Sequence, residues 1–336
     1  MKIMIVGEAY GEKEEETGQP FVGPPGGLLR GTLARVGINA SNCWITNVFN
    51  ERPPGNNVEH FFTKDQSQAD LTWPQFRRSP KMWVAKRHAH HLESLWSLID
   101  AKRPNVIIAL GATALWALTG LGSMEKYRGS PIKTFRGGFK VFPTYHPAAV
   151  LRRWSIKPIF QFDLEKAGRN ATFPEIRRPS RMILYDPSLG EIRQFIRDYI
   201  EPADVVSVDV ETEKGQITEV GFAPSINRAM VIPFYDSRAK SGNYWPSAEY
   251  EYEAWELVRY ILRTKRVVGQ NFQYDMQYFW KTMGIPVLRF TGDTMLLHHS
   301  LQPELQKGLG FMGSIYTEEP AWKTMRADAQ TLKKED

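Results

Sequence analysis

Two acidic residues at the end of an apolar run have the clearest metal-binding spacing in this chain. Asp209 and Glu211 follow the run VVSV, and alternate side chains of a strand point to one face, so the two carboxylates are expected on the same side. A third carboxylate, Asp275, lies further along in VVGQNFQYD. Hard divalent cations prefer carboxylate oxygens, so these residues predict a site for Mg²⁺ or Mn²⁺. A solvated acidic pair on a strand edge is the alternative.

Polar and aromatic residues follow four apolar, strand-like runs in the N-terminal half. They lie in the segments GEAYGEKEEETGQPFVG, TNVFNERPPGNN, ALGATAL and TYHPAAVLRR. Ligands of open α/β sheets bind beyond the carboxyl ends of the strands. These segments are therefore expected to meet around a pocket.

The elements that would position these residues form two groups. Residues 1–170 alternate apolar runs such as KIMIVG and NVIIAL with helical periodicity, including residues 82–101, which predicts an α/β sheet covered by helices. In the second half, Ser188 and Glu191 form a capping-box pattern before a helix. The runs VVSVDVET, QITEVGFA and AMVIPFY then follow with short polar turns between them, which predicts an antiparallel meander.

The composition indicates two domains and a polyanionic partner. The chain has 336 residues, 42% of them apolar, enough for about two domains of ~150 residues. A net charge of +6 favours nucleic acid, although a merely basic surface carries the same charge. The single cysteine, Cys43, excludes an internal disulfide and a cysteine-held metal framework. No signal peptide or membrane-spanning run is found, so a cytoplasmic protein without membrane contact is expected.

The four N-terminal segments resemble the uracil-DNA glycosylase superfamily, most closely its family 4 branch. That pattern runs GEAPG, G-x-PFVG, CRPPxNR, LGxxA and PTYHPS, and residues 3–155 follow it in order. The resemblance implies a three-layer α/β/α domain over residues 1–172 and DNA as the partner. The polar, proline-marked run ATFPEIRRPSR predicts a linker over residues 173–182.

The same resemblance implies a uracil pocket. Phe21 would stack on the extruded base, Asn47 or Asn56 would pair with its polar edge, and His146 would donate a hydrogen bond toward its O2. Each residue also has an ordinary structural explanation, such as a core phenylalanine or a turn asparagine. Only their joint occurrence favours the pocket.

Glu8 and Glu14 match acidic positions of the first motif, where one acid would orient the attacking water or stabilise the cationic sugar. Three positions depart from the pattern: Tyr10 replaces a proline, Asn57 an arginine, and Glu51 the cysteine of CRPP. Family 4 enzymes hold an iron–sulfur cluster on four cysteines, so no cluster is expected here. An active glycosylase and a module that binds DNA without cutting it are both left open.

Basic residues around the last of these segments are expected to contact backbone phosphates, unless they only solubilise the surface. They are Arg128, Arg136, Lys140, Arg152 and Arg153. His88 and His91 have an i, i+3 spacing that could bind a metal. No acidic or third imidazole partner is evident from the sequence, so no metal site is predicted there.

The acidic segments of the second half resemble the DEDD 3′–5′ exonucleases of the DNA polymerase I (family A) type. SVDVET is similar to their first motif and GQNFQYDMQYF to their second. The resemblance implies a ribonuclease H-like fold with a mixed sheet over residues 183–336, and Mg²⁺ or Mn²⁺ held by Asp209, Glu211 and Asp275. In the third motif a Tyr or His precedes a final Asp by four residues, but here Tyr316 precedes Pro320. The exonuclease domain is therefore expected to be incomplete in this sequence.

Together the two resemblances predict a DNA-processing protein, of viral origin, that joins uracil excision to metal-dependent 3′–5′ exonuclease activity. Some phage DNA polymerases join such modules, so the sequence is expected to be the N-terminal part of a family A DNA polymerase. A downstream polymerase domain or replication proteins are expected as further partners, in the cytoplasm or, for a viral protein, in the host cytoplasm. The alternative is a non-catalytic adaptor that uses both modules to grip DNA or to sense uracil.

Overall fold

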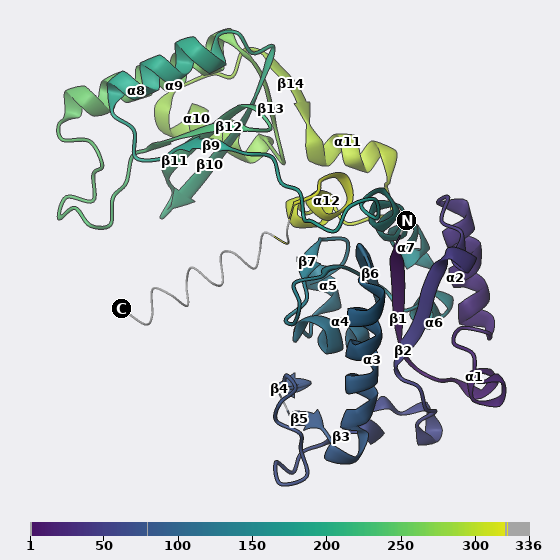
Figure 1. Ribbon diagram of the computed structural model, residues 1–336. Coiled ribbons are helices and arrows are strands. Elements are labelled where there is room, and N and C mark those ends of the chain that lie inside the picture. The colour runs from purple at the N-terminus through teal and green to yellow at the C-terminus, as the bar shows by residue number, and fades with distance from the viewer. Residues whose placement is uncertain (1, 79, 320, 322–336) are drawn as a thin grey trace. The chain divides into compact units, whose positions relative to one another are not determined.

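The chain forms two compact units in the computed structural model, which describes residues 2–78, 80–319 and 321. The first unit runs to Arg177 and takes up the chain again from Gly310, and the second is formed by Arg178–Leu309 (Figure 1). The second unit is thus inserted between two parts of the first.

A five-stranded sheet forms the centre of the first unit, in the order β2-β1-β6-β8-β7. Four of its strands are parallel and the last is an antiparallel edge: β1 (Ile3–Ala9), β2 (Cys43–Phe49), β6 (Val106–Leu110), β8 (Lys140–Thr144) and β7 (Ile132–Lys133). Every residue of β6 is buried, as expected of a parallel strand that is covered on both faces.

Helices cover both faces of this sheet, which confirms the predicted three-layer α/β/α fold. Figure 1 shows α3 and α4 on one side and α2, α6 and α7 on the other. The α-helices of this unit are α1 (Glu12–Thr17), α2 (Pro24–Arg35), α3 (Ala89–Lys102), α4 (Ala112–Thr119), α5 (Met124–Tyr127), α6 (Pro147–Arg152), α7 (Lys157–Arg169) and α12 (Leu309–Tyr316). Leu92 and Trp116 of α3 and α4 pack with Met4 and Val6 of β1 in one core.

Residues 82–101 do not form one helix, so that prediction is wrong at its start. β5 (Lys81–Val84) pairs with β3 (Phe62–Thr63) and β4 (Arg77–Arg78) in a small antiparallel sheet, and α3 begins only at Ala89. Met82 and Val84 are buried at alternate positions, and so short an apolar run fits a strand as well as a helix. Short 3₁₀ helices complete the unit: η1 (Ala40–Asn42), η2 (Pro54–Asn56), η3 (Val58–Phe61), η4 (Lys86–His88) and η5 (Trp154–Ile156).

The second unit is built on a mixed six-stranded sheet in the order β14-β13-β10-β11-β12-β9. Its strands are β9 (Met182–Leu184), β10 (Val205–Glu213), β11 (Gln216–Ser225), β12 (Arg228–Pro233), β13 (Arg266–Gly269) and β14 (Phe290–Asp293). β10, β11 and β12 form the predicted antiparallel meander, and β13 and β14 continue the sheet in parallel with β10. This arrangement agrees with the expected ribonuclease H-like fold.

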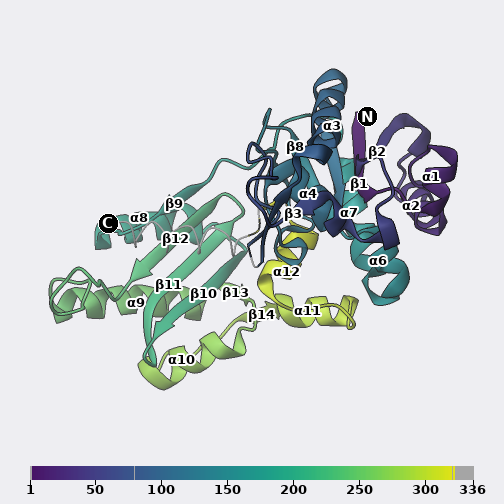
Figure 2. The ribbon, with the colours of Figure 1, turned by 90° about the horizontal axis from the view of Figure 1, so that it is seen from below.

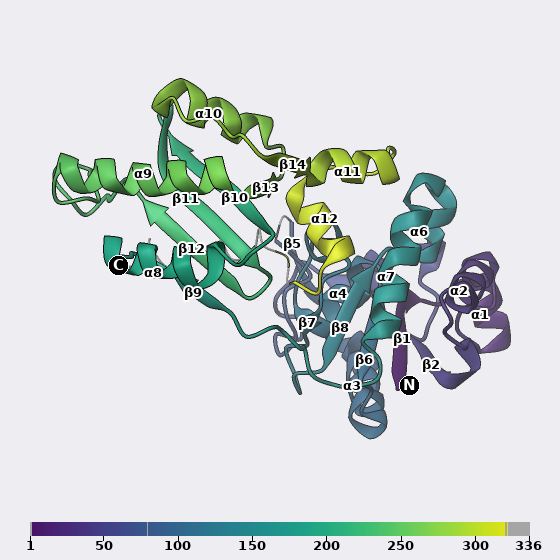
Figure 3. The same ribbon diagram turned by 90° about the horizontal axis from the view of Figure 1, so that it is seen from above.

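The helices of the second unit, except α11 (Thr294–Leu301), share a core with the apolar side of β10. The helices that share it are α8 (Leu189–Phe195), extended by the π-helical turn η6 (Ile196–Ile200), α9 (Ala248–Thr264) and α10 (Gln273–Met283). Figures 2 and 3 show α8 and α9 running along the sheet. Ile192 and Val258 of these helices share one core with Val206, Val208 and Val210 of β10. None of the helices that the structure describes has the length and apolar composition needed to span a bilayer.

The capping box at the start of α8 is present as predicted. The Glu191 amide donates to Ser188 Oγ (3.3 Å), and the Ser188 amide donates to Glu191 Oε2 (2.9 Å).

Ser188→Ala is expected to lower the free energy of unfolding of the second unit by about 1 kcal/mol, because a helix-terminal amide loses its acceptor. Urea unfolding followed by circular dichroism measures the change. Ser300→Ala is the control, because within the described residues the Ser300 hydroxyl donates only to Leu296 O of its own helix. An equal loss in both variants would contradict the assignment.

The last helix, α12, packs within the first unit apart from its first residue, Leu309. Lys166 Nζ donates to Gly129 O (2.7 Å) and to Ser314 O (3.0 Å), and Arg128 donates to Ser314 Oγ (2.9 Å). Residues far apart in the sequence therefore complete the same buried polar cluster.

Candidate functional site

A pocket of about 610 Å³ lies at the carboxyl ends of β1, β2, β6 and β8 in the first unit. It is lined by all six residues that the sequence assigns to uracil binding and excision, namely Glu8, Glu14, Phe21, Asn47, Asn56 and His146. Small-molecule sites typically enclose about 300–1,000 Å³. The fold thus brings the predicted residues together from separate segments around a cavity of suitable size.

The side-chain amide of Asn47, a residue of β2, is buried and has an unpaired donor among the described residues. The residue is 1% exposed, and its Nδ2 finds no acceptor in the described part of the chain. A buried donor left unpaired costs roughly 1–3 kcal/mol. A ligand that offers an acceptor here would recover that free energy.

Phe21 is held beside this amide in a backbone conformation that is uncommon for a residue with a side chain. Its φ is +60°, in the left-handed region, and its amide donates to Glu14 Oε1. Its ring centroid lies 5.8 Å from that of His146. Gly7 makes room for both neighbours, because a Cβ there would lie 2.5 Å from Phe21 Cζ and 2.2 Å from Asn47 Oδ1.

The two acidic residues of the pocket have different hydrogen-bond partners. Both oxygens of Glu14 accept from backbone amides, Oε2 from Gly11 (2.6 Å) and Oε1 from Phe21. Glu8 accepts through Oε2 from Thr113 Oγ1 in the first turn of α4, and its Oε1 has no partner among the described residues. Glu14 therefore fixes the loop of Phe21, whereas Glu8 keeps one oxygen for a water or a ligand.

His146 presents a neutral imidazole to the pocket. Its Nδ1 accepts from the Ala148 amide (3.2 Å) at the start of α6. Burial, helped by the charge of Arg152, lowers the pKa of His146 from 6.5 to about 4. Since Nδ1 is an acceptor, the neutral ring carries its proton on Nε2 and can donate a hydrogen bond at neutral pH.

Two of the five basic residues predicted to contact phosphates are buried instead. Arg128 is 3% exposed and pairs with Asp163, with its Nε 3.0 Å from Oδ2. Lys140 is 1% exposed and donates to three backbone carbonyls at and beyond the end of α7. Both charges are satisfied inside the fold, so the prediction that they contact DNA is wrong.

The other three basic residues, Arg136, Arg152 and Arg153, are exposed. Arg152 lines the pocket. The guanidinium of Arg136 lies 5.6 Å from the ring centroid of Trp73 and 5.5 Å from that of Trp96. Their contact with phosphates stays a prediction.

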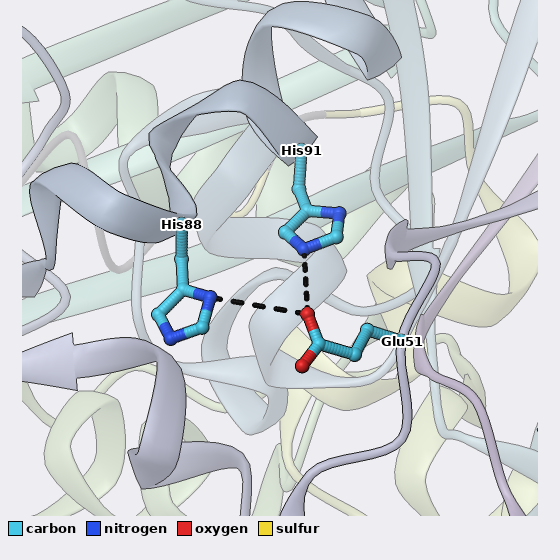
Figure 4. A group of neighbouring side chains, drawn as sticks. All are labelled: Glu51, His88 and His91. Carbon is cyan, nitrogen blue, oxygen red and sulfur yellow. Dashed lines mark hydrogen bonds and ion pairs between the residues drawn. The ribbon is translucent and has the colours of Figure 1, made fainter.

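A second polar group joins His88 and His91 to an acidic partner that the sequence did not reveal. Figure 4 shows both imidazoles turned toward the Glu51 carboxylate. Glu51 Oε2 lies 3.1 Å from His91 Nε2 and 3.9 Å from His88 Nδ1. Burial is the main cause that lowers the pKa of both imidazoles, so the rings are neutral near pH 7.

The predicted carboxylates of the second unit lie around β10. Asp209 and Glu211 occupy alternate exposed positions on that strand, and Asp275, buried in the first turn of α10, accepts from the Val210 amide (2.9 Å). Desolvation, with the charge of Glu211 added, raises the pKa of Asp209. Desolvation, with the charge of Asp209 added, raises that of Asp275 to about 6. Within the described residues, the ligand oxygens of these three do not all lie within 4.8 Å of one another.

Asp293 is a candidate positioning residue to which the sequence analysis assigned no role. Its Oδ1 accepts from the amides of Asn271 (3.0 Å) and Met295 (2.8 Å), and its Oδ2 accepts from that of Phe272 (2.8 Å). These bonds tie the end of β14 to the loop before α10, and α10 carries Asp275. The sequence feature that could have identified Asp293 is its position between a strand and a helix, which is typical of an N-cap residue.

Comparison with known proteins gives a match over the N-terminal half and weaker ones beyond it. The sequence model of the Uracil DNA glycosylase superfamily matches residues 1–166. The type-4 uracil-DNA glycosylase of Thermotoga maritima is 38% identical over 170 residues, 49% of this chain and 76% of that protein. The DNA polymerase of Bacillus phage SP01 is 24% identical over 224 residues, 63% of this chain and 21% of the polymerase. Among solved structures, Escherichia coli RNase D, an exoribonuclease involved in structured RNA processing, aligns with 42% of this chain and 34% of its own, at 11% identity and a TM-score of 0.31.

Proposed function

The chain belongs to the uracil-DNA glycosylase superfamily, and from this premise we propose that its first unit removes uracil from DNA by hydrolysing the N-glycosidic bond. The observation that carries the proposal is the unpaired Nδ2 of buried Asn47 in the pocket lining. Uracil offers an acceptor oxygen, O4, for this donor, whereas cytosine has an amino group at that position. The amide would therefore select uracil.

The other pocket residues supply the remaining steps. Phe21 stacks on the flipped base. As the glycosidic bond breaks, uracil leaves with negative charge on O2, and the Nε2–H of His146 donates to that oxygen. Glu8 orients the water that attacks the sugar carbon and stabilises the cationic sugar. Free uracil and an abasic site are the products.

Excision is expected to show no dependence on the charge of His146 from about pH 5 to about pH 8. Its lowered pKa of about 4 keeps the imidazole neutral over this range, so the Nε2 proton stays available on both sides of the ordinary histidine value. Single-turnover rates on a uracil-containing oligonucleotide, taken over a pH series, measure this. An inflection near pH 6.5 that His146→Asn removes would contradict the proposed donor.

We propose a second activity for the second unit, the metal-dependent removal of nucleotides from the 3′ end of DNA. Asp209, Glu211 and Asp275 would hold the Mg²⁺ or Mn²⁺ ions, and the raised pKa values of Asp209 and Asp275 support a site that a cation would stabilise. When bound, the metal would activate water and neutralise the leaving 3′ oxygen. The third-motif prediction falls partly on Pro320 and residues 322–336, which lie outside the described residues, and stays a prediction.

We further propose that both activities belong to one DNA-processing protein, of viral origin, that serves a family A-type DNA polymerase. The similarity to the phage polymerase supports this, because it covers 63% of the chain and so extends beyond the glycosylase-like part. A non-catalytic adaptor that grips DNA with both units is the alternative.

Incubation with uracil-containing DNA and with normal 3′-labelled DNA, each with and without Mg²⁺, tests these hypotheses. Abasic product supports the first activity, and metal-dependent shortening supports the second. DNA binding without either product supports the adaptor and contradicts both proposed activities.

A further inference from the structure

We propose that Glu51, His88 and His91 form a binding site for one divalent transition-metal ion of the Zn²⁺ type. One ligand atom from each residue lies within 4.8 Å of the others (Figure 4). Two imidazoles and one carboxylate, with water in the fourth position, are a recurrent ligand set for Zn²⁺. Protein imidazoles suit Zn²⁺, Co²⁺ and Ni²⁺, whereas Mg²⁺ and Ca²⁺ prefer sites made of oxygen atoms.

The three ligands come from elements that the fold brings together. Glu51 lies two residues beyond the end of β2, His88 ends η4, and His91 lies in the first turn of α3. Residues three apart on a helical segment share a face, so the two imidazoles can reach one ion. An ion here would tie the loop after β2 to the start of α3.

Aromatic side chains hold the two imidazoles in place. The ring of Phe61 packs edge-to-face on His88 at 5.1 Å, and that of Phe49 on His91 at 5.7 Å. The two histidines are 7% and 9% exposed, whereas the Glu51 side chain is 46% exposed. The group therefore has a fixed, desolvated side and an open side, and the open side gives an ion entry and a water ligand.

An iron–sulfur cluster does not fit this donor set. Such clusters are held by cysteine thiolates, and the group offers one carboxylate and two imidazoles. The single thiol of the chain, that of Cys43, begins β2, whereas Glu51 follows the end of that strand. The ligand types select a mononuclear site instead.

Metal binding would change one hydrogen bond that is present without the ion. Arg87 Nε donates to His88 Nε2 (3.0 Å), which places the proton of a neutral His88 on Nδ1, facing Glu51. For Nδ1 to bind the ion, this proton must move to Nε2, and Arg87 must turn away. Arg87 is exposed, so it can do so without disturbing the core.

The site adjoins the pocket and would support one of its walls. The loop that follows Glu51 supplies Pro53 and Asn56 to the pocket lining. An ion bound at Glu51 would limit the motion of this loop. The site itself does not depend on the proposed glycosylase activity, because metal binding is measured without DNA.

Isothermal titration of the full chain, free of any polyhistidine tag, with ZnCl₂ tests the proposal. Excess Mg²⁺ in the buffer keeps Zn²⁺ from the carboxylates of the second unit. One Zn²⁺ per chain with an increase in melting temperature is expected, and Co²⁺ should give the visible absorption of a tetrahedral site. His91→Ala and Glu51→Gln should each weaken Zn²⁺ binding at least about tenfold, since even outer-shell changes cost about 10–100-fold.

His90→Ala is the matched control. His90 is exposed and lies beside His91 on the same helix, so its loss should leave the affinity unchanged. Glu51→Gln keeps the side-chain shape at an accessible position, so it tests the site even if His91→Ala unfolds. No saturable Zn²⁺ binding to the full chain, wild-type affinity in Glu51→Gln, or an equal loss in His90→Ala would overturn the proposal.

Discussion

Replacing Asn47 by alanine is expected to lower the single-turnover rate of uracil excision by about 10²–10³-fold. Removal of one preorganised hydrogen-bond donor from an active site costs about that much. The Nδ2 of Asn47 has no protein partner among the described residues, so the change breaks no hydrogen bond of that atom within the fold. The loss should therefore appear in the excision rate, with a much smaller change in melting temperature.

Asn42→Ala is the matched control for this variant. Asn42 is exposed and directly precedes β2, at the end of the strand away from the pocket, so the rate should be unchanged. A folded Asn47→Ala chain that excises uracil at the wild-type rate would remove the observation on which the first proposed activity depends.

Replacing Asp209 by alanine is expected to reduce metal-dependent shortening of 3′-labelled DNA by about 10³-fold or more. A catalytic metal supplies several kcal/mol of transition-state stabilisation, and each 1.36 kcal/mol corresponds to tenfold in rate. Asp209 lies on the exposed side of β10, whereas Val208 and Val210 point into the core. The substitution should therefore spare the fold. Gel analysis over a Mg²⁺ series measures the effect.

Glu213→Ala provides the comparison for Asp209→Ala. Glu213 lies on the same strand and the same exposed face, so it tests whether any lost carboxylate has this effect. Asp209→Ala should retain uracil excision, and Asn47→Ala should retain shortening. Wild-type shortening in Asp209→Ala would refute the metal assignment, and loss of both activities in either variant would indicate a general folding defect.

The sequence predicted those features that depend on local pattern. The alternation around Asp209 and Glu211 placed both carboxylates on one face, and β10 has that alternation. The residues of the pocket could be grouped because each follows a parallel strand, and parallel strands present their carboxyl ends at one edge of a sheet. The capping box at the start of α8 could be identified because Ser188 and Glu191 lie within one helical turn of each other.

Features that depend on tertiary contacts could not be predicted in this way. Only the folded chain supplies the Asp163 carboxylate that pairs with Arg128 and the backbone carbonyls that accept hydrogen bonds from Lys140. Likewise, Glu51 reaches His88 and His91 only when β2 and α3 lie together. No periodic pattern in the sequence predicts such a contact.

The first unit contains residues from before and after the second unit, so the order of synthesis determines when its packing can be completed. Lys166, whose pKa burial lowers to about 8, receives two of its carbonyl acceptors from Ser314 and Thr317. A ribosome makes these residues only after the whole inserted unit has been synthesised. The final packing of the first unit is therefore delayed until the second has emerged, and a fragment that ends at Arg177 would leave a buried ammonium group short of acceptors. Completion of the first unit therefore depends on prior synthesis of the second, although each unit has its own core.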